Sequence, residues 1–299
     1  MTQTSTPRPV NGSTTSDGCE VLKLVYFGTP AAAVPPLQAL VAAGHEIAAV
    51  VTQPDRRRGR GSGLVASPVR LTAEALGLAV LTPEKARTIV DELRAFDADL
   101  GVVVAFGQLL PVELLAAIGG GLVNVHFSLL PRWRGAAPVE RAILAGDSET
   151  GVCIMGVEEG LDTGPVFART TITVGEEETA GELHARLVQA GTQLLVATVP
   201  KLATITPEVQ DGEPTYAAKL SVYEFELDLA RPAGELMRLV RAGNPRPGAW
   251  LTVDGARFKV WSAHESEGRF VPDEVQPGGK PRMAYAAWRA GHRSSDPFA

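Results

Sequence analysis

The sequence lacks the residues and segments on which several classes of protein depend. Its 299 residues include only two cysteines, Cys19 and Cys153, too few for a disulfide framework or a cysteine-rich zinc site and typical of a reducing compartment. No apolar run approaches the roughly 20 residues that cross a bilayer, and the amino terminus has no apolar stretch typical of a secretory signal. We therefore expect a cytoplasmic protein with no membrane segment and no metal.

Two binding signals are also missing. The net charge is −6, so no basic field covers the whole protein, and any nucleic-acid surface must be local. The turn after the first predicted strand, Gly28-Thr29-Pro30, lacks the G-x-G-x-x-G pattern whose glycines let a backbone approach a pyrophosphate. This second absence argues against a nicotinamide or flavin cofactor.

Most of the chain alternates apolar strand patterns with helical ones. The predicted strands are 21–27, 45–52, 78–81, 100–105, 122–127, 151–157 and 166–174, and the predicted helices are 33–43, 68–76, 86–96, 112–118, 140–145 and 181–202. Such alternation predicts a doubly wound α/β sheet with parallel strands. Ligands of these sheets bind at the carboxyl ends of the strands.

The composition divides the chain into four parts. Residues 1–20 are rich in Ser, Thr, Pro and Gly and should form a disordered extension. Residues 21–205 form the α/β domain, 206–219 are polar and read as a linker, and 220–299 form a second domain with a hairpin signal at Asp254-Gly255. From Leu229 to Ala299 the net charge is +4, whereas the rest carries −10, which favours an anionic partner for the tail.

Two polar residues interrupt the buried strand at 122–127. The period of two places Asn124 and His126 on one face, about 7 Å apart along the strand. Asn124 could donate hydrogen bonds to an oxyanion, and His126 could exchange a proton near neutral pH. Asp162, in a later turn, would orient the imidazole and favour its charged form.

This amide, imidazole and carboxylate set suits acyl transfer to an amine. Ser128 would share the same face, but no G-x-S-x-G elbow surrounds it, so direct transfer is favoured over a covalent acyl-enzyme. Taken singly, a histidine in a buried strand is more often a hydrogen-bonded core residue, and an Asp before Thr-Gly is more often a turn residue.

A glycine-rich loop concentrates positive charge near the start of the chain. Arg56, Arg57, Arg58 and Arg60 fall within five residues. Their mutual repulsion makes the loop suited to bind phosphates. The alternative interpretation is a solvated charged loop without a ligand.

Several segments, in this order, resemble the methionyl-tRNA formyltransferase family. They are GTP (28–30), QPDRRRGRG (53–61), SPV (67–69), VVVAFGQLLP (102–111), VNVHFSLLPRWRGAAPVERAILAGD (123–147), EEGLDTGPV (158–166), QDGEPTYAAKLS (210–221) and VQPGGKPRM (275–283). The NVHFSLLP core is shared with other folate-dependent formyltransferases, whereas the QPDR loop and the tail narrow the resemblance to the tRNA enzyme. The resemblance implies transfer of a formyl group from 10-formyltetrahydrofolate to the α-amino group of methionyl initiator tRNA.

The resemblance also assigns roles to residues. Asn124, His126 and Asp162 match the catalytic triad, in which the amide polarises the formyl oxygen and the Asp sets the charge of the histidine. Eight residues are expected to bind or wall the folate: Ser128, Leu129, Leu130, Pro131, Phe106, Gly107, Leu109 and Leu110. The arginine loop is expected to meet the acceptor stem of the tRNA.

The implied fold is a Rossmann-like formyltransferase domain followed by a smaller OB-like β-barrel that binds tRNA. Two departures stand out. Ser62-Gly63 replaces a Lys-Lys pair common in the family. Only the short run Ser262 to Asp273 precedes VQPGGK, so we expect a trimmed barrel. We also expect the protein to be a monomer.

Two other functions remain open at this stage. The same chemistry could formylate an amino sugar nucleotide, in which case the arginine loop would be dispensable. A non-catalytic RNA-binding module that has kept the fold is the third hypothesis, against which the intact triad argues.

Overall fold

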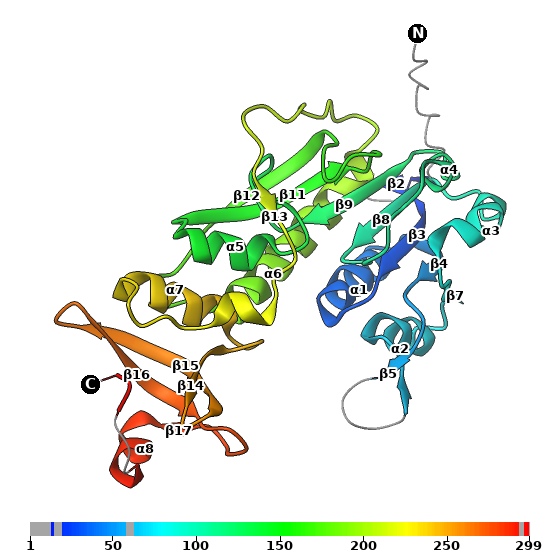
Figure 1. Ribbon diagram of the computed structural model, residues 1–299. Helices are drawn as coiled ribbons and strands as arrows, with labels where there is room; N and C mark the ends of the chain where they lie inside the picture. Colours follow the sequence, from blue (N-terminus) through cyan, green and yellow to red (C-terminus); the bar gives the residue numbers. More distant parts are fainter. Residues whose placement is uncertain (1–12, 15–19, 58–62, 293–295, 299) are drawn as a thin grey trace. The chain divides into compact units, whose positions relative to one another are not determined.

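The computed structural model describes residues 13–14, 20–57, 63–292 and 296–298 (Figure 1). The chain divides into two compact units. The first comprises residues up to Arg134 together with Gly151–Thr171 and Leu187–Pro214; the second comprises Gly135–Thr150, Ile172–Arg186 and Thr215–Ala299. Most of the expected amino-terminal extension lies outside the described residues, although Ser13–Thr14 (β1) pairs antiparallel with Glu20–Val21 (β2).

A seven-stranded sheet carries the first unit. Its strands, in spatial order, are β12 (Val166–Thr173), β11 (Glu149–Gly156), β9 (Leu122–His126), β8 (Leu100–Val104), β3 (Lys23–Gly28), β4 (Glu46–Val51) and β7 (Val80–Leu81). The five strands from β9 to β7 are parallel, and β11 pairs antiparallel with β9. The expected Rossmann-like α/β sheet is therefore confirmed.

Helices fall between the strands where the apolar pattern predicted them. They are α1 (Val34–Ala42), α2 (Pro68–Ala75), α3 (Val90–Ala95), α4 (Val112–Leu115), α5 (Pro138–Ala145) and α6 (Ala180–Thr198). Local chemistry sets their ends: the Ser67 hydroxyl caps α2 by accepting a hydrogen bond from the amide of Arg70, and α5 stops at Gly146 in the left-handed conformation. No helix of the described residues is long and apolar enough to cross a membrane.

The two faces of β9 meet different surroundings. Leu122 belongs to a buried cluster that includes Leu93 of α3 and Leu114 of α4. A Cβ added at Gly191 of α6 would lie 3.1 Å from Val125, so α6 packs closely against the odd-numbered side of the strand. By the period of two, the side chains of the even-numbered residues Asn124 and His126 project from the face opposite α6.

The second unit contains a small antiparallel sheet. Its strands are β14 (Ala249–Val253), β15 (Ala256–Ser266), β16 (Arg269–Gln276) and β17 (Met283–Ala284), and its helices include α7 (Ala233–Gly243) and α8 (Tyr285–Gly291). The predicted hairpin at Asp254-Gly255 joins β14 to β15. The run from Ser262 to Asp273 is mostly strand, since β15 continues to Ser266 and pairs with β16.

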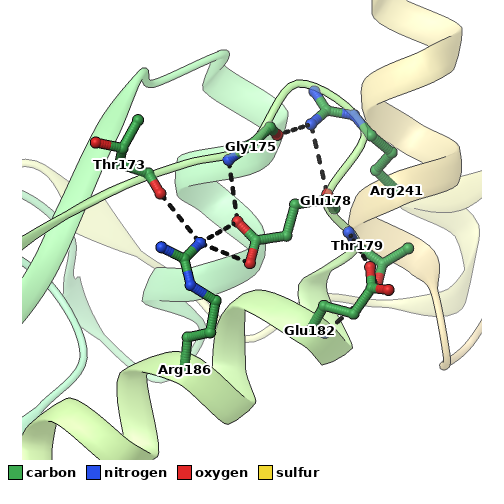
Figure 2. Close-up of polar contacts among 7 residues, drawn as sticks. All are labelled: Thr173, Gly175, Glu178, Thr179, Glu182, Arg186 and Arg241. Carbon is green, nitrogen blue, oxygen red and sulfur yellow. Dashed lines mark hydrogen bonds and ion pairs between the residues drawn. The ribbon is translucent and has the colours of Figure 1, made fainter.

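A buried carboxylate organises the connection between β12 and α6. Glu178, whose side chain is 10% exposed, accepts hydrogen bonds from the Gly175 amide at 3.0 Å and from Nη1 of Arg186 at 2.8 Å. Arg241 of α7 donates to the carbonyls of Gly175 and Glu178. Figure 2 shows Arg186 and Arg241 reaching this loop from two different helices. The carboxylate of Glu178 thus holds Arg186 of α6, whereas the backbone carbonyls of the same loop hold Arg241 of α7.

Replacing this carboxylate tests its contribution to stability. We expect Glu178→Ala to lower the free energy of unfolding by about 1.5–3 kcal/mol, because it removes charged hydrogen bonds and leaves the Gly175 amide without its acceptor. Urea denaturation measures the change. Glu177→Ala, at an exposed neighbouring position, is the matched control and should change stability by less than about 0.5 kcal/mol; equal effects of the two substitutions would contradict the prediction.

Candidate active site

Strand β9 delivers two polar side chains toward its carboxyl end. His126 lies opposite Cys153 of β11, and Asn124 lies between Met155 of β11 and Val103 of β8. His126 is 5% exposed, whereas Asn124 is half-buried. Within the described residues no hydrogen bond engages the side-chain amide of Asn124, so the N–H groups of this side chain are available to a ligand.

Both ring nitrogens of His126 face an oxygen. Nε2 lies 2.9 Å from the carbonyl oxygen of Trp133, and Nδ1 lies 3.6 Å from Oδ2 of Asp162. A carbonyl oxygen only accepts hydrogen bonds, so this contact places the proton of the neutral ring on Nε2. The unprotonated Nδ1 then faces the carboxylate, which stabilises the ring when Nδ1 takes up a proton.

Asp162 reaches the histidine from a turn of the chain between β11 and β12. Its backbone has φ 50°, in the left-handed region, and its side chain is 18% exposed. The side-chain amide of Gln210 donates to the carbonyls of Asp162 and Gly164 at 2.8 and 2.7 Å. The structure thus brings together His126 and Asp162, which are 36 positions apart in the sequence.

Three of the sequence motifs meet at the carbonyl of Phe106. Thr29 and Gln53 both donate a side-chain hydrogen bond to this oxygen at 2.9 Å. They follow β3 and β4, and Phe106 follows β8, so the contact joins the carboxyl ends of three neighbouring strands. This is the edge of the sheet at which ligands of α/β proteins bind.

The predicted folate residues on this edge differ in accessibility. The Phe106 ring is buried in the core at 5.5 Å from Phe27, centroid to centroid. Gly107 is exposed with φ 79°, and the side chain of Gln53 occupies the place that a Cβ added at Gly107 would take. Leu109 is 92% exposed and Leu110 is half-buried. Apolar contact with a ligand is therefore available from the leucines rather than from the phenylalanine.

The loop from Ser128 to Pro131 is held mostly by its own buried side chains. Ser128 is fully buried and donates its hydroxyl hydrogen to the carbonyl of Arg132 at 2.6 Å. Leu130 packs in a small cluster with Cys153, Met155 and Val166. Leu129 and Pro131 are half-buried, so they and the loop backbone can reach a ligand while Ser128 and Leu130 fix its shape.

The arginine loop is only partly described. Arg56 and Arg57 are exposed on β5 (Arg56–Arg57), which pairs with β6 (Leu64–Val65). The neighbouring carboxylate of Asp55 forms its ion pair with Arg70 of α2 at 3.1 Å and not with Arg56 or Arg57 of β5. Arg58, Arg60 and Ser62 lie outside the described residues.

Sequence reasoning missed three residues that support the site. The Trp133 carbonyl holds His126, Gln210 holds the Asp162 turn, and Arg134 donates to Oε1 of Gln210 at 3.0 and 2.6 Å. All three lie inside motifs noted in the sequence, RWRG and QDGEPT. The motifs therefore marked the segments that contain these residues, but they did not show which contacts the three residues make.

Two further features of the described residues concern cysteine and possible metal ligands. Burial raises the pKa of the Cys153 thiol, which keeps it protonated and unreactive. No cluster of three or more His, Cys, Asp or Glu side chains suited to a metal occurs in the described part of the chain. The arrangement can stabilise an oxyanion through Asn124 and move a proton through His126.

Comparisons with known proteins agree with this chemistry. Residues 22–199 match the family described as "Formyl transferase", and residues 219–278 match "Formyl transferase, C-terminal domain". The methionyl-tRNA formyltransferase of Dinoroseobacter shibae is 49% identical over 260 residues, which cover 86% of this chain and 87% of the relative. That of Thiobacillus denitrificans is 43% identical and covers 92% and 98%.

Among solved structures, HypX from Aquifex aeolicus in complex with tetrahydrofolic acid superposes with a TM-score of 0.66 at 13% identity, covering 90% of this chain and 47% of HypX. At this identity the likeness concerns the fold alone. The two sequence relatives, by contrast, align over most of both proteins, and both formyl transferase domains are matched in order. The chain belongs to the methionyl-tRNA formyltransferase family.

Proposed function

We propose that this protein transfers the formyl group of 10-formyltetrahydrofolate to the α-amino group of methionyl initiator tRNA, giving N-formylmethionyl-tRNA for translation initiation. The observation that carries the proposal is the placement of Asn124 and His126 on one strand, with Asp162 3.6 Å from the imidazole. This arrangement suits acyl transfer to an amine. The high identity to methionyl-tRNA formyltransferases over most of their length supports the acceptor.

The proposed mechanism uses the three side chains in turn. The Asn124 amide donates a hydrogen bond to the formyl oxygen and stabilises the negative charge that develops as the amine attacks. His126 accepts the proton lost by the amine at Nδ1, where Asp162 stabilises the imidazolium. The bond between the formyl carbon and the folate nitrogen then breaks, and the proton passes to that nitrogen. No redox change accompanies the transfer.

The folate would lie at the carboxyl ends of the parallel strands, beside the two predicted folate segments, 106–110 and 128–131. The exposed Leu109 and the half-buried Leu110 supply apolar contact for a flat ring, and the exposed backbone of Gly107 lies beside them. The wall of the folate site would be completed by Leu129, Pro131 and the backbone of their loop. The buried side chains of Phe106, Ser128 and Leu130 would support this wall without touching the folate. The tetrahydrofolic acid bound to HypX supports a folate ligand for this fold.

Each unit, taken by itself, carries basic side chains suited to the acceptor. In the first unit Arg56 and Arg57 are exposed, and Arg58 and Arg60 continue the same loop in sequence. This concentration of charge suits the phosphates of an acceptor stem.

In the second unit, cations lie over the rings of two buried tryptophans. The guanidinium of Arg257 lies 4.0 Å from the Trp250 ring centroid, and that of Arg282 lies 3.7 Å from the Trp261 ring centroid. Burial and then the charges of Arg257 and Arg282 lower the pKa of Lys259. A phosphate close to these groups would relieve their repulsion, which supports an RNA-binding role for this sheet.

We propose the domain division 21–205 for catalysis, 206–219 for the linker and 220–299 for tRNA binding. The two family matches, 22–199 and 219–278, support these boundaries. A monomer acting in the cytoplasm completes the proposal. The scarcity of cysteine in the chain supports that compartment.

A transfer assay with three acceptors tests the function and its alternative. Purified protein, labelled 10-formyltetrahydrofolate and charged initiator tRNA should yield labelled formylmethionyl-tRNA, with elongator methionyl-tRNA a poorer acceptor. An amino sugar nucleotide should accept no label. Label on the sugar but not on tRNA would replace the proposed function with the alternative, and a folded protein inactive on all three would contradict both.

Removing the proton-transfer pair tests the mechanism. We expect His126→Ala and Asp162→Asn each to lower kcat by roughly 10²- to 10⁴-fold, because proton transfer loses its carrier or the charge that stabilises it. Folate binding, measured by fluorescence titration, should persist. Asp91→Ala removes a 95% exposed carboxylate of α3 paired with Arg94 and serves as the control. Unaltered turnover of either site variant would exclude that residue from the mechanism.

A further inference from the structure

We propose that Gln210 is a positioning residue for the formyl transfer, and that it sets the place of Asp162 relative to His126. The inference rests on the proposed function, because it concerns the same triad. Gln210 touches neither the imidazole nor the carboxylate in the described contacts. It acts through the backbone of the turn that presents Asp162.

The side chain of Gln210 uses both ends of its amide. Its Nε2 donates to the carbonyl of Asp162 at 2.8 Å and to the carbonyl of Gly164 at 2.7 Å. Its Oε1 accepts from Nε and Nη2 of Arg134 at 3.0 and 2.6 Å. A primary amide has two N–H donors and one oxygen with two lone pairs, so the hydrogen-bonding capacity of this side chain is fully used.

The turn that Gln210 holds has an irregular backbone. Asp162 has φ 50°, a left-handed conformation that Asp adopts more readily than most residues with a Cβ but that is still less stable than right-handed backbone. The turn is also tight, since a Cβ added at Gly164 would lie 1.9 Å from the carbonyl oxygen of Gly156. The two hydrogen bonds from Gln210 to carbonyls of the turn fix both the position and the orientation of the Asp162 backbone.

The side chains of Gln210 and Arg134 together form what we call the clamp. Its Arg134 end reaches the turn that fixes the histidine. Arg134 directly follows Trp133, whose carbonyl oxygen lies 2.9 Å from Nε2 of His126. Trp133 is itself at φ 63°. Gln210 therefore links two irregular turns, one that holds the imidazole and one that holds the carboxylate, and their separation sets the 3.6 Å distance between the two groups.

The backbone around Gln210 is anchored to the sheet. Glu208 and Val166 exchange both backbone hydrogen bonds, at 2.7 and 2.8 Å, which gives the clamp a fixed base beside β12. Gln210 itself belongs to the segment between the two matched family domains, 22–199 and 219–278. A residue of the connecting segment thus takes part in shaping the catalytic centre.

The test measures whether Gln210 acts through Asp162. We expect Gln210→Ala to lower kcat by about 10- to 100-fold, the effect of a displacement near 1 Å in an active site, while KM for the folate changes less than about twofold. In an Asp162→Asn background the same substitution should cause no further loss, because the group it positions has lost its charge. Single-turnover assays with enzyme in excess make the slow variants measurable.

Two further variants separate positioning from folding. Gln210→Glu keeps the size and the acceptor for Arg134 but turns an oxygen toward two carbonyls, so its kcat should fall as far as that of Gln210→Ala. Glu208→Ala removes the neighbouring ion pair with Arg169 at 2.6 Å and is the control, with kcat within about twofold of the parent. If Gln210→Ala unfolds at the assay temperature, Arg134→Ala loosens the same clamp from its other end.

The possible outcomes are distinct. Unchanged kcat in folded Gln210→Ala, or an equal loss in the Asp162→Asn background, overturns the proposal while the function stands. A parent protein with no formyl transfer overturns the proposed function itself. A fall in kcat that vanishes when Asp162 is Asn supports the clamp.

Discussion

The contact between the Trp133 carbonyl and the His126 imidazole is the constraint on which the catalytic arrangement depends. A carbonyl oxygen cannot donate, so it holds the ring proton on Nε2 and turns the basic Nδ1 toward Asp162. The ring is almost completely buried, and strand β9 fixes its backbone. Asn124, two residues earlier on the same face, then has a defined place relative to the proton carrier.

This constraint comes from irregular backbone rather than from the sheet. Trp133 and Asp162 both have positive φ, a conformation that is uncommon for Asp and rare for a bulky residue such as Trp, where neighbouring contacts must impose it. The sheet supplies the rigid base, and the hydrogen bonds of Arg134 and Gln210 join the two turns across it. Residues whose motifs are separated by long stretches of sequence therefore determine one interatomic distance.

The parts of the site that follow from periodicity were predictable from the sequence. The strand at 122–127 and the common face of Asn124 and His126 depend only on the period of two, and the turn carrying Asp162 depends on Gly and Pro. The support from Trp133 and Gln210 was not predictable, because a backbone carbonyl has no sequence signature. A contact across 48 positions also depends on the path of the whole chain.

The second unit shows the same limit. The hairpin at Asp254-Gly255 was predicted from its turn residues, but the continuation of β15 to Ser266 was not. Its outer half, which contains His264 and Glu265, reads as a polar loop, and only pairing with β16 makes it a strand. Charge composition predicted an anionic partner for this part of the chain, while the stacking of Arg257 and Arg282 on tryptophans required the structure.

The most direct test of the account is the position of the proton on the neutral His126 ring. Nitrogen NMR of protein with isotopically labelled histidine distinguishes the two ring nitrogens, and the His126→Ala spectrum assigns the signals. The geometry predicts a hydrogen-bearing Nε2 and an unprotonated Nδ1 in the neutral form. A neutral ring with its proton on Nδ1 would contradict the division of roles between Trp133 and Asp162.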